Sequence, residues 1–215
     1  MKKWLVIGVS GVTCGGKTTV ARSLHESLPG SYLLCQDDYF LPPDSSKHTW
    51  IPTLNHINWE IMSSVDMNKM WADIKRITQF NFLQHFSHCK IHKEKSSNDL
   101  PLMNFEALAG ELPFHIVIIE GFLVLNYQPI VEICHLKYYL TLTRDQCWER
   151  RKVRIYDPPD VPGYFDVCVW PEYEKHRDEV FQTVADVHII DGTRDVRQVV
   201  SNIFLDIMKY KKITM

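Results

Sequence analysis

The sequence lacks an apolar run long enough to cross a membrane, and it lacks an excess of charge of either sign. Its first apolar stretch covers about six residues, 4–9. A membrane-spanning helix needs ~20 such residues, and the core of a secretory signal needs about 7 to 15. The formal net charge is −2, so general attraction to nucleic acid or anionic lipid is not expected. These absences predict a cytoplasmic protein that binds neither nucleic acid nor membrane.

Paired cysteines, internal repeats and interdomain linkers are also missing. Six cysteines are present, but none form a C-x-x-C pair and their spacing has no disulfide-like rhythm. This usage favours a reducing compartment. A chain of 215 residues is long enough for one α/β domain with a sizeable core and too short for two. We therefore expect a single domain over residues 1–215, acting as a monomer.

Near its start the sequence contains a glycine-rich phosphate-binding pattern. The pattern G-x-x-x-x-G-K-[ST] is matched by Gly11-Val12-Thr13-Cys14-Gly15-Gly16-Lys17-Thr18. A strand-like segment precedes it and a helical pattern over 18–28 follows, so successive backbone N–H groups would point at a bound anion. Lys17 would reach the β- and γ-phosphates, and the Thr18 hydroxyl would hold Mg²⁺. This context favours a nucleoside triphosphate site over a chance glycine-rich turn.

Alternating strand and helix patterns predict the fold. Short apolar segments rich in β-branched and aromatic residues are typical of strands buried on both faces of a parallel sheet. Such segments lie at residues 4–9, 32–35, 115–119, 136–142 and 187–190. Apolar residues at three- and four-residue spacing predict helices near 67–77 and 196–207. We expect an α/β P-loop NTPase fold of three layers, with a parallel five-stranded sheet, helices on both faces and a lid.

The segment at residues 85–113 interrupts this rhythm and is expected to be a surface excursion. Within it, His85, His88, Cys89 and His92 have a spacing that would suit a metal ion. No second pair of ligands accompanies them in the sequence. A solvated helix end is therefore the favoured interpretation, with a zinc site as the alternative.

Two acidic positions follow predicted strands and are candidates for the chemistry. Asp37 comes directly after the segment 32–35, at the carboxyl end of a strand, where ligands bind in such sheets. It is the candidate base that accepts the proton of an attacking hydroxyl and helps to hold Mg²⁺; a helix cap or turn is the alternative. Glu120 ends the apolar segment 115–119 in the form of a Walker B acid, which orients Mg²⁺ or its waters.

A basic segment followed by a proline-rich one predicts a lid over about 150–170. Arg150 and Arg154 are expected on one helix face, and Arg151 lies three residues from Arg154. Arginine neutralises charge on a transferring phosphoryl group and can arrive on a mobile lid. A merely solvated basic face is the alternative.

In this order, these elements resemble the uridine kinase-like branch of P-loop small-molecule kinases, and within it the nicotinamide riboside kinases. The matching strings are Gly8-Val-Ser-Gly-Val-Thr, Gln36-Asp-Asp-Tyr-Phe, Ile119-Glu-Gly-Phe, Pro158-Pro-Asp-Val-Pro-Gly-Tyr-Phe-Asp166 and Val169-Trp-Pro171. The resemblance covers residues 4 to about 195 apart from the excursion. It implies ATP-dependent phosphorylation of the ribose 5′-hydroxyl of nicotinamide riboside, or of its nicotinic acid form, to the mononucleotide used in NAD synthesis.

The resemblance also implies roles for individual residues. The expected catalytic residues are Asp37, Lys17 and Arg151, and the expected Mg²⁺ ligands are Thr18, Asp37 and Glu120. The expected ATP contacts are Gly11, Val12, Thr13, Cys14, Gly15, Gly16, Lys17, Thr18, Thr19, Arg150, Arg154, Tyr156, Arg194, Asp195 and Val196. The expected substrate contacts are Asp37, Asp38, Tyr39, Phe40, Trp59, Glu60, Arg151, Tyr156 and Asp157. Among these, Trp59 and Tyr156 match the aromatic residues that flank the nicotinamide ring, a cation attracted to aromatic faces.

Two departures from the family and three alternative readings accompany this assignment. One departure is the 85–113 excursion, which is longer than is usual in the family. Glu60, matched with Arg151 to the residues that hold the ribose hydroxyls, stands where the family usually has Asp. A uridine or cytidine kinase is the nearest alternative, but a neutral pyrimidine needs polar partners at its edge. A non-catalytic nucleotide switch is disfavoured because no N-K-x-D guanine-reading element is present. An interaction protein without turnover is disfavoured because the catalytic residues named above are intact.

Overall fold

Strand β1 (Lys3–Gly11) forms the centre of a parallel sheet. The computed structural model describes residues 3–79 and 112–214. The other strands of the sheet are β2 (Tyr32–Cys35), β5 (Phe114–Glu120), β6 (Leu136–Thr141) and β7 (Val187–Asp191). Their order is β2-β5-β1-β6-β7, and each pairing is parallel. The predicted fold class, an α/β fold with a parallel five-stranded sheet, is confirmed.

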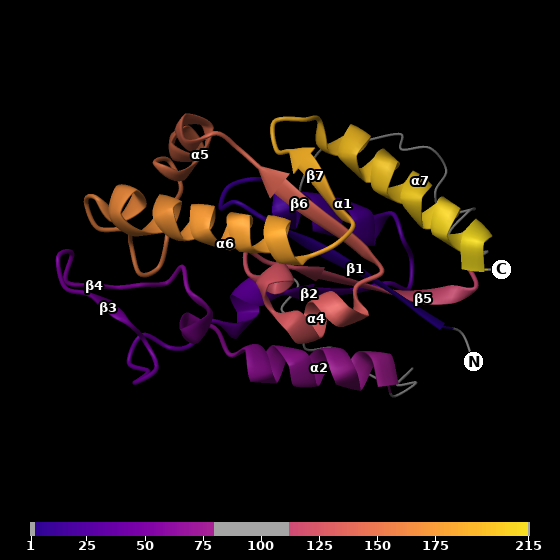
Figure 1. The fold of residues 1–215 in the computed structure, drawn as a ribbon, viewed down its shortest axis with the longest axis horizontal. Helices are drawn as coiled ribbons and strands as arrows, with labels where there is room; N and C mark the ends of the chain where they lie inside the picture. Colours follow the sequence, from indigo (N-terminus) through magenta and orange to yellow (C-terminus); the bar gives the residue numbers. More distant parts are fainter. Residues whose placement is uncertain (1–2, 80–111, 215) are drawn as a thin grey trace.

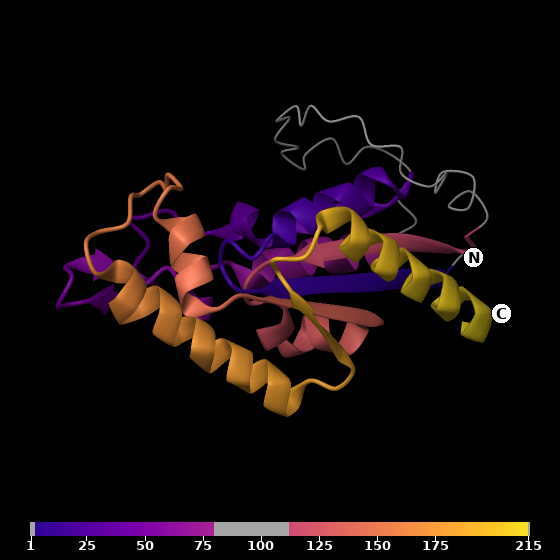
Figure 2. The ribbon, with the colours of Figure 1, turned by 90° about the horizontal axis from the view of Figure 1, so that it is seen from above.

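The side chains of β1 alternate between two apolar layers. Leu5, Ile7 and Val9 pack on one face with residues of α1 (Lys17–Glu26) and α7 (Val196–Thr214). Val6 packs on the other face, where the covering helices are α2 (Met67–Gln79), α4 (Gln128–Ile133) and α6 (Trp170–Thr183). Figure 2 shows α1 and α7 on one side of the sheet and α4 and α6 on the other. Burial on both faces explains why the strands are continuous apolar runs in the sequence.

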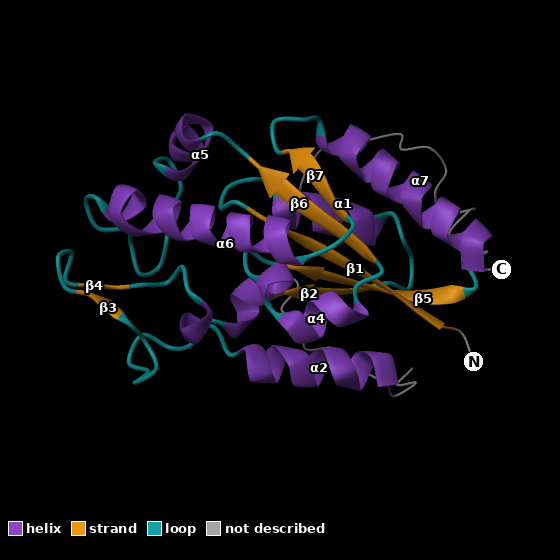
Figure 3. Cartoon of the chain, in the orientation of Figure 1, coloured by secondary structure: helices purple, strands orange, loops and turns teal. Residues whose placement is uncertain are grey.

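The carboxyl ends of the strands gather at the end of the molecule opposite the two chain termini (Figure 1). Loops, short helices and a hairpin dominate this end (Figure 3). Its short elements are η1 (Gln36–Tyr39), the hairpin strands β3 (Trp50–Ile51) and β4 (His56–Ile57), η2 (Met62–Ser64) and η3 (Val124–Asn126). Residues 152–164 lie within the predicted lid of about 150–170 and are named the lid segment. They connect α5 (Arg144–Arg151) to the π-helix η4 (Phe165–Val169), which continues into α6.

The predicted strands agree with the observed ones to within two residues at each end. The prediction that Arg150 and Arg154 share a helix face is wrong. Helix α5 ends at Arg151, and the Arg154 N–H donates to the Arg151 carbonyl at 2.9 Å in a tight turn beyond the helix. The chain therefore leaves the helical path before Arg154, and this side chain belongs to the lid segment.

One prediction lies outside the described residues. The candidate zinc ligands His85, His88, Cys89 and His92 fall there, as does most of the 85–113 excursion. Among the helices that the structure does describe, none combines the length and the apolar character that a membrane span requires.

His135 extends the pairing of β1 through its side chain, and its protonation is expected to weaken the fold. Its backbone N–H donates to the Val6 carbonyl at 2.9 Å, while the Val6 N–H donates to His135 Nδ1 at 3.1 Å. Burial lowers the pKa of His135, and the charge of Lys137 lowers it further. The folded state thus binds this proton less readily than the unfolded state, whose His pKa is about 6.5. The stabilising contribution is complete above about pH 6.5 and is lost as the pH falls below it.

The test compares the wild type with His135→Asn, whose Oδ1 can accept the same N–H without titrating. Urea unfolding between pH 7.5 and pH 5 is expected to give a steeper loss of free energy of unfolding for the wild type than for the variant. Parallel curves would contradict the role of His135, because the other histidines are common to both proteins.

Candidate active site

The phosphate loop joins β1 to α1. Gly11 has a φ of 129°, and a Cβ there would lie 2.1 Å from the Leu140 carbonyl oxygen, so only glycine allows this approach to β6. Gly16 takes a left-handed conformation, with φ of 94°, directly before α1. Lys17 Nζ donates to the Val12 carbonyl at 2.8 Å. The Lys17 ammonium group thus lies against the backbone of the loop, at a helix N-terminus of the kind that binds anions.

Thr18, Glu120 and Asp37 come together beside this loop. Thr18 Oγ1 donates to Glu120 Oε1 at 3.0 Å, and Cys35 Sγ donates to the same oxygen at 2.7 Å. Glu120 is 2% exposed; burial raises the pKa of its carboxyl, and the negative charge of Asp37 raises it further. Asp37 itself is exposed in η1. The end of β2 and the end of β5 therefore place two carboxylates next to the first turn of α1.

The oxygen atoms of Thr18, Asp37 and Glu120 form a donor set that fits Mg²⁺, which prefers hydroxyl, carboxylate, phosphate and water oxygens. A divalent cation would also favour the charged form of a buried Glu120 that lies near a second carboxylate. Within residues 3–79 and 112–214, no group of three or more His, Cys, Asp and Glu side chains forms a metal cluster. Mg²⁺ at this position would therefore need waters and nucleotide phosphates as further ligands.

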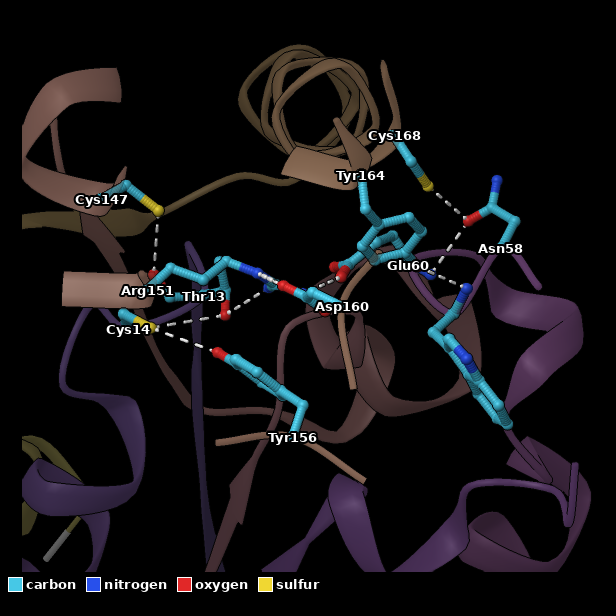
Figure 4. A network of polar contacts seen from close by, with 11 residues as sticks. Thr13, Cys14, Asn58, Glu60, Cys147, Arg151, Tyr156, Asp160, Tyr164 and Cys168 are labelled. Carbon is cyan, nitrogen blue, oxygen red and sulfur yellow. Dashed lines mark hydrogen bonds and ion pairs between the residues drawn. The ribbon is translucent and has the colours of Figure 1, made fainter. Parts of the chain in front are cut away.

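Arg151 is the centre of a buried ionic network (Figure 4). Its side chain is 4% exposed. Its Nε and NH2 donate to Asp160 at 2.7 and 3.0 Å, NH2 donates to Glu60 Oε1 at 3.2 Å, and NH1 donates to Thr13 Oγ1 at 3.1 Å. Burial acts to lower the pKa of Arg151, but Glu60 and Asp160 raise it overall, so the guanidinium stays charged. Burial raises the pKa of Glu60, an effect that the Arg151 charge opposes.

Tyr156 joins the lid segment to the phosphate loop (Figure 4). Its hydroxyl lies 3.4 Å from Cys14 Sγ. Its ring lies 4.4 Å from the guanidinium carbon of Arg151 and 5.2 Å from that of Arg154, measured to the ring centroid. The aromatic faces of Tyr156 therefore contact arginines in this arrangement.

The predicted nucleotide-contacting turn after β7 lies beside the phosphate loop. Arg150 NH1 donates to the Cys14 carbonyl at 3.0 Å and to the Gly192 carbonyl at 3.1 Å. A Cβ at Gly192 would lie 2.7 Å from the Gly15 carbonyl oxygen. Residues 194–196 follow after Thr193, with Asp195 Oδ1 accepting backbone N–H groups at the start of α7. The structure thus brings this turn, the phosphate loop and α5 together.

The other residues predicted to contact the substrate differ in their exposure and in the side chains that they contact. Trp59 packs edge-on against Phe40 and His48, with ring centroids 5.8 and 4.6 Å apart. The Tyr39 hydroxyl donates to Asp73 of α2 at 3.1 Å, so this side chain is turned towards α2. Asp38 and Asp157 are exposed, as is Thr19 at the start of α1. Of the two rings predicted to flank nicotinamide, Trp59 contacts other rings, whereas Tyr156 contacts guanidinium groups.

A small cavity connects the phosphate loop to the predicted ribose-binding residue. Its lining includes Gly11 and Thr13 of the loop together with Glu60, Tyr139 and His176. Glu60 therefore lies close to both the phosphate loop and α6, although it follows the β3–β4 hairpin in the sequence.

Sequence reasoning missed Gln36, whose side chain is fully buried. Gln36 Oε1 accepts the Leu123 N–H at 2.9 Å, and a Cβ at Gly121 would lie 2.3 Å from Gln36 Cβ. Gln36 therefore ties the turn that carries Asp37 to the loop that follows Glu120. Its signals in the sequence were its position directly before Asp37 and its place at the start of the matching string Gln36-Asp-Asp-Tyr-Phe.

Asn58 and Asp160 were also missed. Asn58 Nδ2 donates to Glu172 Oε1 at 3.0 Å, and Asn58 Oδ1 accepts the Glu60 N–H at 3.0 Å. Asp160 is the closest ionic partner of Arg151. Asn58 stands directly before two predicted substrate contacts and Asp160 lies in the proline-rich string, but neither position indicates which side chain it meets.

The sheet with β1 at its centre, the phosphate loop that follows β1, and the acids at the ends of β2 and β5 define a P-loop kinase of the small-molecule type. Two solved structures share the fold. The gluconokinase from Sinorhizobium meliloti 1021 has a TM-score of 0.54 and 13% identity, with 98% of this chain and 95% of that chain covered. The shikimate kinase from Acinetobacter baumannii has a TM-score of 0.50 and 16% identity, covering 98% and 96%.

The chain belongs to the nicotinamide riboside kinase family, and the predicted resemblance is confirmed. It is 36% identical to nicotinamide riboside kinase 1 of Mus musculus over 205 residues, which is 95% of this chain and 94% of that protein. Its identity to nicotinamide riboside kinase 1 of Homo sapiens is 34% over 207 residues, covering 96% and 94%. The nicotinamide riboside kinase of Schizosaccharomyces pombe is 25% identical over 195 residues, covering 84% and 82%. No family model matches the chain.

Proposed function

We propose that this kinase transfers the γ-phosphoryl group of ATP to the ribose 5′-hydroxyl of nicotinamide riboside. The observation that carries the proposal is the grouping of Thr18, Glu120 and Asp37 at the first turn of α1, where Thr18 Oγ1 lies 3.0 Å from Glu120 Oε1. Such a grouping places an acceptor for a hydroxyl proton beside a triphosphate site. Membership of the nicotinamide riboside kinase family supports nicotinamide riboside as the nucleoside that accepts the phosphoryl group.

Asp37 acts as the base in this proposal. Its exposed carboxylate accepts the proton of the 5′-hydroxyl as the oxygen attacks the γ-phosphorus. A new bond forms between the 5′-oxygen and phosphorus, and the bond from phosphorus to the β,γ-bridging oxygen breaks, which releases ADP. Lys17 exchanges the Val12 carbonyl for phosphate oxygens, and Arg150 lies beside the same loop, donating to the Cys14 carbonyl at 3.0 Å. Positioning and charge neutralisation supply most of the catalysis in such reactions.

Mg²⁺ is part of the same proposal. When bound, it would neutralise charge on the β- and γ-phosphates. Thr18 and Asp37 would hold it directly, and Glu120 would orient it or its waters. Thr18 and Glu120 already contact each other, so these two side chains are close together before the ion binds.

Glu60 and Arg151 hold the ribose hydroxyls in this proposal. The pair is buried and joined by a hydrogen bond of 3.2 Å, so the carboxylate and guanidinium present a fixed acceptor and donor to a diol. Arg151 is also bound to Asp160 and Thr13. Substrate entry therefore exchanges some of these contacts for contacts to the sugar.

A uridine or cytidine kinase remains the second candidate because of Tyr156. Its ring is already contacted by two guanidinium groups, at 4.4 and 5.2 Å from the centroid. Those positive charges would repel a pyridinium ring that stacked nearby, and they would not repel a neutral pyrimidine. The purified protein should therefore be tested with ATP and Mg²⁺ against nicotinamide riboside, nicotinic acid riboside, uridine and cytidine at equal concentrations. Faster phosphorylation of uridine or cytidine than of nicotinamide riboside would overturn the proposal.

Replacing Trp59 with alanine is expected to weaken the binding of nicotinamide riboside more than the binding of uridine. A cation over a tryptophan face gains about 0.5–2 kcal/mol, which corresponds to roughly a 2- to 30-fold change. Steady-state KM values for the two nucleosides give the measurement, with Trp50→Ala on the exposed hairpin as the control, since that side chain is 57% exposed. An equal rise in KM for both nucleosides would contradict a cation–π contact between Trp59 and the nicotinamide ring.

A further inference from the structure

Helix α6 contacts the backbone of Glu60 through His176. His176 Nε2 lies 3.0 Å from the Glu60 carbonyl oxygen. A carbonyl only accepts hydrogen bonds, so Nε2 must carry the hydrogen. The imidazole thus acts as a donor from the covering helix to the residue that the proposed function assigns to the ribose.

His176 is held in this form by its surroundings. Its side chain is 12% exposed, and burial lowers its pKa, so the ring carries one proton near neutral pH. The charged groups that face it are Glu172, 3.7 Å from Nε2, and Glu179, 3.9 Å from Nδ1, with Lys175 also near. Since Nε2 holds the single proton, Nδ1 is unprotonated.

The same helix also fixes the other backbone group of Glu60. The Glu60 N–H donates to Asn58 Oδ1 at 3.0 Å, and Asn58 Nδ2 donates to Glu172 Oε1 at 3.0 Å. Glu172 and His176 are four residues apart on α6, so they lie on one helix face. The carbonyl of Glu60 is therefore bound to α6 directly, and its N–H is bound to α6 through Asn58.

The side chain of Glu60 reaches Arg151 from this fixed backbone. Its Oε1 accepts from Arg151 NH2 at 3.2 Å, while Arg151 is itself bound to Asp160 and Thr13. A glutamate side chain has several rotatable bonds, and each adds freedom that the site must restrict. Fixing both backbone groups reduces the positions from which the carboxylate can meet the guanidinium.

We infer that His176 is a positioning residue for phosphoryl transfer: its Nε2–H holds the Glu60 carbonyl so that Glu60 and Arg151 together present the ribose. The inference rests on the proposed function, because Glu60 acts on the sugar only if the substrate is a nucleoside. His176 does not itself touch the substrate. A loss of its hydrogen bond should therefore act on nucleoside binding and leave ATP binding nearly unchanged.

The test compares three substitutions at one position with a control on the same helix. His176→Leu and His176→Phe remove the donor, whereas His176→Gln keeps an N–H donor at a similar reach. The two apolar variants are expected to raise the KM for the nucleoside about tenfold, since a displacement of about 1 Å can alter rates strongly. The KM for ATP should change less than about twofold, and His176→Gln should restore the nucleoside KM to within about threefold of the wild type. Asp178→Asn, on an exposed part of α6, should resemble the wild type.

Two results would overturn the inference while leaving the proposed function standing. In one, the wild type phosphorylates a nucleoside, but a folded apolar variant keeps the wild-type KM for that nucleoside. Equal rises in the KM for the nucleoside and the KM for ATP would count in the same way. The other is a ¹⁵N spectrum of the wild type in which the His176 proton lies on Nδ1; this measurement also decides the matter if both apolar variants fail to fold. A wild type that phosphorylates no nucleoside would instead overturn the proposed function itself.

Discussion

Replacing Asp37 with asparagine is expected to lower kcat by about 10²- to 10⁴-fold, the usual contribution of a positioned base. The amide has nearly the same shape but cannot accept the proton of the attacking hydroxyl. Asp37 lies exposed in η1, close enough for its charge to raise the pKa of the buried Glu120. Turnover of the preferred nucleoside under saturating ATP gives the measurement.

Binding of ATP should survive this substitution. The phosphate loop and Lys17 do not depend on Asp37 for their contacts, since Lys17 Nζ is held by the Val12 carbonyl at 2.8 Å. Calorimetric titration with a non-hydrolysable ATP analogue should therefore give similar affinities for the wild type and the variant. The control is Asp44→Asn, which changes an exposed carboxylate outside the site. Normal turnover by Asp37→Asn would remove Asp37 from the role of base.

Replacing Arg151 with methionine is expected to lower both activity and stability. The substitution leaves Glu60, with its side chain 14% exposed, without its ionic partner. Removing one member of a buried ion pair costs about 3–5 kcal/mol of unfolding free energy, and the lost donor should lower kcat/KM by about 10²-fold or more. Urea unfolding and steady-state kinetics measure the two effects.

Asp160→Asn provides the matched comparison. Asp160 contacts the same guanidinium at 2.7 Å, but its side chain is 30% exposed, so water can replace part of the lost contact. A loss of about 1 kcal/mol is expected there. Equal losses of stability in Arg151→Met and Asp160→Asn would contradict the view that the pair with Glu60 is the costly one to break.

The fold could be predicted because its main signals are local. Strands buried on both faces, such as β1 and β5, are continuous apolar runs whose ends coincide with a glycine or an acid. Since the carboxyl ends of parallel strands share one edge of the sheet, the sequence alone predicts Asp37 and Glu120 near the phosphate loop. Thr18 was placed by the spacing of the loop motif itself.

The contacts that orient the site could not be predicted in this way. His176 and Glu60 are 116 residues apart in sequence, and Asn58 and Glu172 are 114 apart. Their meeting depends on how α6 lies across the sheet, which no local pattern encodes. The end of α5 at Arg151 was missed because the basic run continues past the point where the backbone turns. Nothing in that run distinguishes a helical arginine from one in the lid segment.

The packing of Gln36 against Gly121 links two positions 85 residues apart in the chain. A methyl group at position 121 would stand 2.3 Å from Gln36 Cβ, so any side chain there must push the neighbouring strand end aside. Because Gln36 immediately precedes Asp37, that push would move the proton acceptor relative to the nucleotide without altering a single reacting atom. Every residue except glycine carries the Cβ that causes this clash, so a side chain at position 121 would require either glycine at position 36 or a shift of the strand end.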